Sequence, residues 1–160
     1  MARTPRWATF DCYGTLVDWN GGIRAELSRL FSAERAPARF YHAIEPGIQR
    51  DRPDASYREV MASIRSIGVP FDGTVVASEI GSYKPAHRHW QVFYEITGAD
   101  RSRHVHVAQS HFHDIVHAAE LGIPSVWINR LRERVSPPPT VELETLDGLA
   151  AALDGIVAPG

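Results

Sequence analysis

The stretch VHVAQSHFHDIVHAAELGIPSVWINR, residues 105–130, holds two apolar runs that are separated by a helical pattern. The runs HVHVA (104–108) and PSVWI (124–128) are short and rich in residues that favour strands. Between them we expect a helix from near Asp114 to Gly122 and Pro124, with apolar positions at Ile115, Val116, Ala119 and Leu121. A strand, a helix and a second strand of these lengths predict a right-handed crossover between parallel strands.

Further elements extend this pattern in both directions along the chain. WATF (7–10) and VVAS (75–78) are typical of strands, and a short extended piece is expected from Thr140 to Leu143. A helix after Pro85 is expected to bury one face and to stop at Gly98, and a last helix follows the extended piece. Their apolar positions are Trp90, Phe93, Tyr94 and Thr97 in the first helix, and Leu146, Leu149, Ala150 and Leu153 in the last. The fold class predicted is α/β, a Rossmann-like parallel sheet with flanking helices.

Composition and length describe an ordinary globular chain. At 160 residues, with 44% apolar and 22% charged residues, we expect one domain over residues 1–160. The net charge of −2 gives no reason to expect nucleic acid or a membrane surface as a partner. No membrane span or signal peptide is recognisable, so a cytoplasmic location is the expectation. Cys12 is the single cysteine, which excludes an internal disulfide.

Several polar residues fall where the predicted strands end. Asp11, Ser78, Gln109 and Asn129 take these positions, and Lys84 and Asp114 lie in the turns that follow. Ligands of open parallel sheets bind beyond the carboxyl ends of the strands. One edge of the sheet is therefore expected to gather two carboxylates and a lysine.

Three segments in this order resemble the haloacid dehalogenase (HAD) superfamily of hydrolases, and within it the 2-haloacid dehalogenases. They are FDCYGTLVDW (10–19), GSYKP (81–85) and the stretch 105–130. The resemblance covers the first strand and helix and most of the chain from Val69 onward. It implies a Rossmann-like core with a helical cap, and a hydrolase whose aspartate forms an ester with a small anionic substrate.

The resemblance also assigns roles to individual residues. Asp11 matches the nucleophile, Thr15 would orient it, Lys84 would hold it charged, and Asp114 would position Lys84 or the hydrolytic water. The chemistry fits these assignments, because an ionised and oriented carboxylate is needed for attack and an ammonium offsets developing charge. The residues expected to contact the substrate are Tyr13, Ser110, Trp90 and, as a halide-binding residue of the cap, Arg39.

A phosphatase of the same superfamily is the first alternative. Such enzymes carry a second aspartate two positions after the nucleophile, where this chain has Tyr13, and halide departure needs no such acid. A phosphatase would need Mg²⁺, with Asp11, the Tyr13 carbonyl and Asp114 as ligands, although Gln109 stands where a carboxylate is often found. For dehalogenation the resemblance implies no metal and no other cofactor.

The segment between the first strand and GSYKP is short for this family. Residues 20–67 are predicted to form a reduced helical cap, and the second core strand with its substrate-binding serine or threonine has no counterpart. Ser78 ends a strand-like run, but it lies too close to Lys84 to match that residue. A sheet that lacks a strand exposes an edge, so a homodimer is expected, and a non-catalytic remnant of the family is the second alternative.

Histidines raise the question of a metal site. His113 and His117 lie four apart on a predicted helix, a spacing that can bind zinc, and His104 and His106 share one face of a strand. No third ligand is fixed by these spacings. Ordinary surface or core histidines are the favoured interpretation.

Overall fold

The computed structural model describes residues 5–16 and 71–157. The predicted cap over residues 20–67, including Arg39, lies outside the described residues. The prediction of a single domain over residues 1–160 is likewise not tested.

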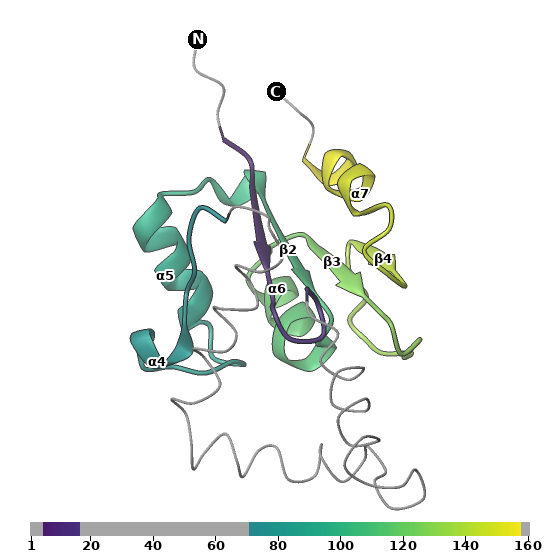
Figure 1. The fold of residues 1–160 in the computed structure, drawn as a ribbon, viewed down its shortest axis with the longest axis horizontal. Coiled ribbons are helices and arrows are strands. Elements are labelled where there is room, and N and C mark those ends of the chain that lie inside the picture. The colour runs from purple at the N-terminus through teal and green to yellow at the C-terminus, as the bar shows by residue number, and fades with distance from the viewer. Residues whose placement is uncertain (1–4, 17–70, 158–160) are drawn as a thin grey trace, which may run out of the picture.

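Four parallel strands form one sheet in the order β1-β2-β3-β4 (Figure 1). They are β1 (Trp7–Phe10), β2 (His104–Ala108), β3 (Ser125–Ile128) and β4 (Val141–Leu143). Trp7 is paired with His104 in the register of the first two strands, and His106 with Ser125 in that of the next two. The predicted α/β class with a parallel sheet is therefore confirmed.

The helices of the described part lie between and after these strands. They are α4 (Ala77–Ile80), α5 (Arg88–Thr97), α6 (Val116–Glu120) and α7 (Leu149–Ile156), with a 3₁₀ turn at Arg101–Arg103 and a π-helical turn at His111–Ile115. Helix α5 ends as expected at Gly98, whose φ of 62° is left-handed and whose N–H donates to the Tyr94 carbonyl. Within the described ranges, no helix has the length and apolar character to cross a bilayer.

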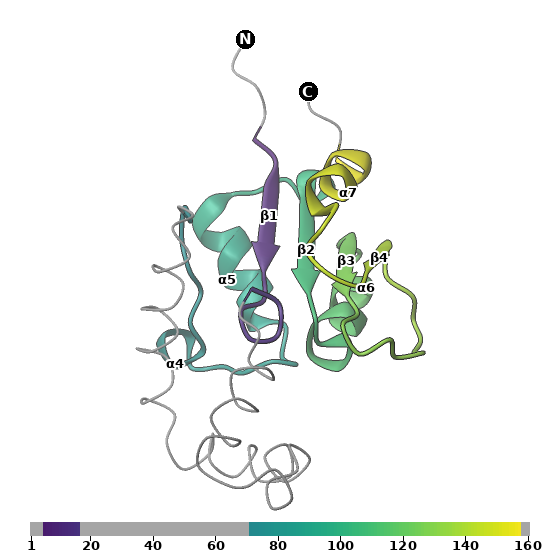
Figure 2. The same cartoon turned by 45° about the vertical axis from the view of Figure 1, so that its right-hand side comes forward.

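The sheet is covered on both faces (Figure 2). On one face Val105, Val107, Val126 and Ile128 pack against apolar residues of α7 and the segment before it. On the other, Trp90 of α5 and Ala118 of α6 pack together with Ile123. Because side chains alternate along a strand, β2 sends valines to one layer and histidines to the other, and all five of its residues are buried.

Three local predictions were wrong. The run VVAS does not form a strand: Val76 is extended, but Ala77 begins α4, which Gly81 ends at a φ of 64°. The helix expected from Asp114 already begins at His111, as a π-helical turn. On the last helix Ala150 is exposed, while Ala152 and Ile156 join Leu149 and Leu153 against the core.

The histidine face of β2 forms a polar layer inside the protein. The Thr9 hydroxyl lies 2.7 Å from His104 Nε2 and 2.8 Å from His106 Nδ1. The hydroxyl of Tyr94 lies 2.6 Å from the other ring nitrogen of His104, which is fully buried. Burial, followed by the nearby charges of His106 and Arg101, lowers the pKa of His104 to about 4.

We expect the stability of the protein to fall as the pH drops from about 6.5 to about 4. In this window the unfolded chain binds a proton at His104 that the folded protein excludes. The free energy of unfolding therefore falls by on the order of 3 kcal/mol. His104→Gln, which keeps hydrogen-bonding groups but does not titrate, should flatten this part of the stability curve measured by urea denaturation.

His113→Gln is the matched control, because His113 is exposed. An equal pH dependence in wild type and His104→Gln would contradict the assignment to His104.

Candidate active site

The site begins where β1 ends. The backbone N–H of Asp11 donates to the Val107 carbonyl over 2.9 Å, which continues the β1-β2 ladder by one residue. The chain then turns at Gly14, whose φ of 79° favours glycine. A Cβ at this position would lie 2.8 Å from the Gln109 side-chain oxygen, so a larger residue would also displace that amide. The turn holds the Asp11 carboxylate at the sheet edge.

Thr15 connects this turn to the end of β2. Its hydroxyl donates to Asp11 Oδ2 over 2.9 Å and accepts from the Gln109 backbone N–H over 2.8 Å. Since Thr15 is fully buried, both bonds are shielded from water. A direct hydrogen bond thus joins Thr15 to Asp11, and the orienting role of Thr15 stays a prediction.

Lys84 lies between the two carboxylates. It comes from the loop between α4 and α5, and its Nζ is 2.9 Å from Asp11 Oδ1 and 2.5 Å from Asp114 Oδ1. Burial disfavours the charged ammonium, but the charges of Asp114 and Asp11 and their hydrogen bonds raise the pKa of Lys84 above its usual value. Lys84 is therefore a fixed positive charge at any physiological pH.

Asp114 is the buried member of this group. Its side chain is 1% exposed, compared with 18% for Asp11. Its Oδ1 also contacts His106 Nε2 at 2.9 Å, while Oδ2 has no hydrogen-bond partner within residues 5–16 and 71–157. Burial would raise the pKa of this carboxyl, but Lys84 and His106 lower it. Of the two carboxylates, Asp11 is therefore the more exposed.

The neighbouring thiol of Cys12 is held in its protonated form. Burial, and next the charge of Asp11, raise the pKa of Cys12 to about 11 despite Lys84. At neutral pH the thiol is protonated, and the thiol form is a poor nucleophile.

The residues predicted to contact the substrate lie in surroundings that differ from one residue to the next. Tyr13 lies in the turn after Asp11. Ser110 caps the π-helical turn, where its hydroxyl contacts His113 Nδ1 at 2.9 Å and accepts from the His113 N–H. Trp90 is 3% exposed in the core, with its ring 5.3 Å from that of His106, which leaves little surface for a substrate. Their substrate contacts stay predictions, and Arg39 lies outside the described residues.

Three further residues belong to the surroundings of the site, and sequence patterns did not single them out for it. His106 supports Asp114, and the strand periodicity placed it only on a face. Arg130, directly after β3, donates from Nε to the Gly14 carbonyl and from a terminal nitrogen to the Thr15 carbonyl, each over 3.0 Å. His89 of α5 has a pKa lowered by burial and then by Lys84, which favours the neutral imidazole.

The described residues do not fit Mg²⁺ well. Both oxygens of Asp11 already accept hydrogen bonds, and the Lys84 ammonium lies between the two carboxylates that would have to share the ion. Asp114 Oδ2 is the single unpartnered carboxylate oxygen that the buried, described part of the chain shows. Mg²⁺ favours nearly ideal octahedral oxygen coordination, which one such oxygen does not supply.

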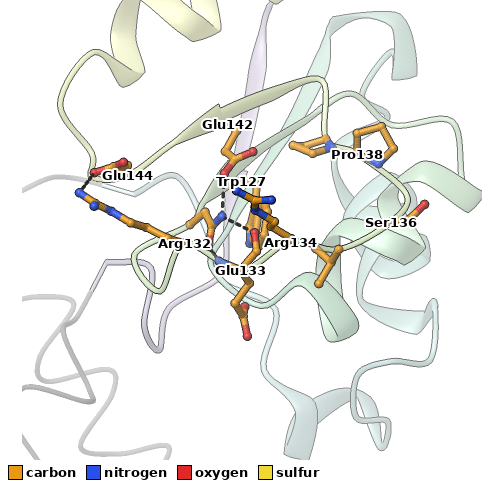
Figure 3. A pocket seen from close by; sticks show the side chains of 11 residues that line it. Trp127, Arg132, Glu133, Arg134, Ser136, Pro138, Glu142 and Glu144 are labelled. Carbon is orange, nitrogen blue, oxygen red and sulfur yellow. Dashed lines mark hydrogen bonds and ion pairs between the residues drawn. The ribbon is translucent and has the colours of Figure 1, made fainter.

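A separate pocket of about 690 Å³ lies toward the β3 and β4 side of the sheet (Figure 3). Trp127, Asn129 and the acidic side chains of Glu142 and Glu144 contribute to its lining. Asn129 Nδ2 donates to Glu142 Oε1 over 2.6 Å, so the amide is hydrogen-bonded within the lining of the pocket. None of the four predicted catalytic residues lines this pocket, and we assign it no part in the chemistry.

Comparison with known proteins identifies the fold. Neither a protein-family model nor a curated protein matches the sequence. Solved structures do match, among them the L-2-haloacid dehalogenase RSc1362, at 15% identity and a TM-score of 0.66, over 93% of this chain and 98% of that chain. The chain therefore has the fold of the HAD superfamily, which confirms the resemblance at this level.

Two other HAD proteins match to a similar degree. The HAD phosphatase from Thermococcus onnurineus is 20% identical with a TM-score of 0.60, over 94% of this chain and 99% of that chain. The magnesium-bound HAD-hydrolase YfnB from Bacillus subtilis is 18% identical with a TM-score of 0.62, over 93% and 98%. Fold similarity alone does not separate a dehalogenase from a phosphatase here.

Replacement of Lys84 should destabilise the protein strongly. Lys84→Met leaves the buried charge of Asp114 without its ammonium partner, and we expect a loss of about 2–4 kcal/mol in the free energy of unfolding. Urea denaturation at neutral pH measures the loss. Arg88→Met, which breaks the exposed pair with Glu95, is the control and should lose less than about 1 kcal/mol. Equal losses would show that the buried charges are not coupled as described.

Arg130 should stabilise the turn through its forked guanidinium. Arg130→Lys keeps the charge but loses the paired contacts to the Gly14 and Thr15 carbonyls. We expect faster hydrogen exchange at the Leu16 amide, which donates to the Cys12 carbonyl across this turn. Arg132→Lys, at a site where the side chain is 77% exposed, is the control. Unchanged protection of the Leu16 amide from exchange in Arg130→Lys would contradict this stabilising role of Arg130.

Proposed function

We propose that the protein is a hydrolase that displaces halide from a small 2-haloacid, with Asp11 as the nucleophile. The observation that carries the proposal is the chain of contacts from Thr15 through Asp11 and Lys84 to Asp114. It leaves one oriented and partly accessible carboxylate beside a fixed positive charge. Such a group is suited to nucleophilic substitution at a small anionic substrate.

The first step is a displacement at carbon. An oxygen of Asp11 attacks the carbon that bears the halogen, a C–O bond forms, and the C–halogen bond breaks with its electron pair leaving as halide. Thr15 and Lys84 hold the attacking carboxylate at Oδ2 and Oδ1. Because halide is a weak base, no proton donor is required for it.

The second step regenerates the enzyme. Water attacks the ester carbonyl carbon of Asp11, the 2-hydroxyacid departs, the carboxylate is restored, and one proton passes to solvent. Lys84 stabilises the negative oxygen that forms on the ester carbonyl. Asp114, whose pKa is lowered, orients Lys84 and the water rather than storing a proton.

A phosphatase is the second candidate, supported by the phosphatase among the structural neighbours and by the unpartnered Asp114 Oδ2. It is disfavoured because Lys84 takes the position between the carboxylates and Tyr13 stands in place of the acid. The small anionic substrate, the homodimer and the cytoplasmic location expected from sequence remain part of the proposal.

The test is halide release from 2-chloropropionate by the purified full chain in the presence of EDTA. We expect release by the wild type and none by Asp11→Asn. Thr15→Val, which removes the bond to Asp11 Oδ2, should reduce the rate by about 10- to 100-fold. Mass spectrometry during turnover should show the substrate acid added to the peptide that contains Asp11.

Other outcomes would reject this assignment. Release of phosphate from p-nitrophenyl phosphate with Mg²⁺, without halide release, would establish the phosphatase. A protein that melts cooperatively but releases neither product and forms no adduct would be a non-catalytic member of the fold.

A further inference from the structure

A second cluster of polar side chains lies where α5 and α6 approach each other. His87 directly precedes α5, and His117 and Glu120 lie one turn apart on α6. We propose that these three residues bind a divalent transition-metal ion, with Zn²⁺ as the representative ion. The site does not depend on the proposed function, because it uses none of the residues of the candidate active site.

The three ligand atoms form a compact triangle. His87 Nε2 is 3.2 Å from His117 Nδ1 and 3.0 Å from Glu120 Oε2, and His117 Nδ1 is 2.8 Å from the same oxygen. In a tetrahedral zinc site with bonds of about 2.0–2.1 Å, ligand atoms lie about 3.3 Å apart. A shift of a few tenths of an ångström would therefore admit the ion.

Hydrogen bonds cannot satisfy all three contacts of this triangle at once. Each ring nitrogen carries either a proton or a lone pair toward its neighbours. If both nitrogens donate to Glu120, the two ring nitrogens are left 3.2 Å apart with no hydrogen bond between them. If His117 instead accepts from His87, its lone pair faces the Glu120 carboxylate at 2.8 Å. A cation at the centre turns all three lone pairs into favourable contacts.

The surroundings suit a bound metal. Two imidazoles and a carboxylate are common zinc ligands, and a water can complete the tetrahedron. The Glu120 side chain is 52% exposed, so an ion can enter from solvent. The His117 side chain is only 17% exposed, so its ring is held by the residues packed around it. The ring of Trp90 packs against His87 at a centroid distance of 6.1 Å.

The metal would connect the two segments that supply Lys84 and Asp114. His87 lies three residues after Lys84, and His117 lies three residues after Asp114. An ion held by both would fix the Lys84 loop relative to the turn that carries Asp114. The site is thus a structural clamp beside the ion pair rather than a centre of chemistry.

The pair that the sequence suggested, His113 with His117, is not the one brought together. His113 Nδ1 contacts the Ser110 hydroxyl instead, and His87, thirty positions from His117, takes its place. His113 therefore provides a matched control on the same helical segment.

The experiment titrates Zn²⁺ into the untagged, chelator-treated full chain by calorimetry. Co²⁺ replaces Zn²⁺ in a second titration, read by its visible absorption. We expect one equivalent to bind, with the intense bands of a tetrahedral ion, and a higher Tm in the presence of Zn²⁺. His87→Ala, His117→Ala and Glu120→Gln should each weaken binding by at least about tenfold.

His113→Ala and Asp11→Asn should bind Zn²⁺ as the wild type does. Absence of stoichiometric binding would overturn the proposal, and so would binding that survives in both His87→Ala and His117→Ala. Loss of binding in Asp11→Asn would place the ion in the active site and would equally overturn it. Should His117→Ala fail to fold, the surface variant Glu120→Gln still decides the question.

Discussion

The ammonium of Lys84 between Asp11 and Asp114 is the interaction on which the candidate site depends. It joins three segments that are far apart along the chain: the turn after β1, the loop before α5 and the turn after β2. Two carboxylates at one sheet edge would repel each other without it, and Asp114 is too buried for water to screen its charge. The same ammonium that stabilises this edge contacts Asp11, the more exposed of the two carboxylates.

Local sequence patterns predicted the elements that have local causes. WATF, HVHVA and PSVWI supplied strands of the sheet, of which β2 and β3 are fully buried and β1 is half-buried. Gly98 ends α5 through its left-handed φ. VVAS carries the same strand-favouring residues, yet no partner strand of the described sheet pairs with it, and the chain turns into α4 instead. Strand formation requires a neighbour that composition does not reveal.

The motif resemblance and the positions of the strand ends predicted four site residues that one chain of contacts joins in the structure. They are Asp11, Thr15, Lys84 and Asp114. His106 and Arg130 escaped because their contacts depend on three-dimensional register. His106 contacts Asp114 from inside a strand. Arg130 donates to the carbonyls of Gly14 and Thr15, which lie more than a hundred positions earlier in the chain. The pairing of His87 with His117 is of the same kind, since no spacing rule links a residue before one helix to the middle of another.

The pairing of β1 with β2 has a consequence for the order of folding. Thr9 meets His104 across 95 positions, whereas β2, β3 and β4 follow one another along the chain. Contacts of long sequence separation carry the greater loop-closure entropy and slow folding. We therefore expect the C-terminal strands to pair first and β1 to dock onto them last. Because Asp11 reaches Lys84 and Asp114 only through that docking, the ion-pair site would form in the final event of folding, after β2, β3 and β4 have been synthesised.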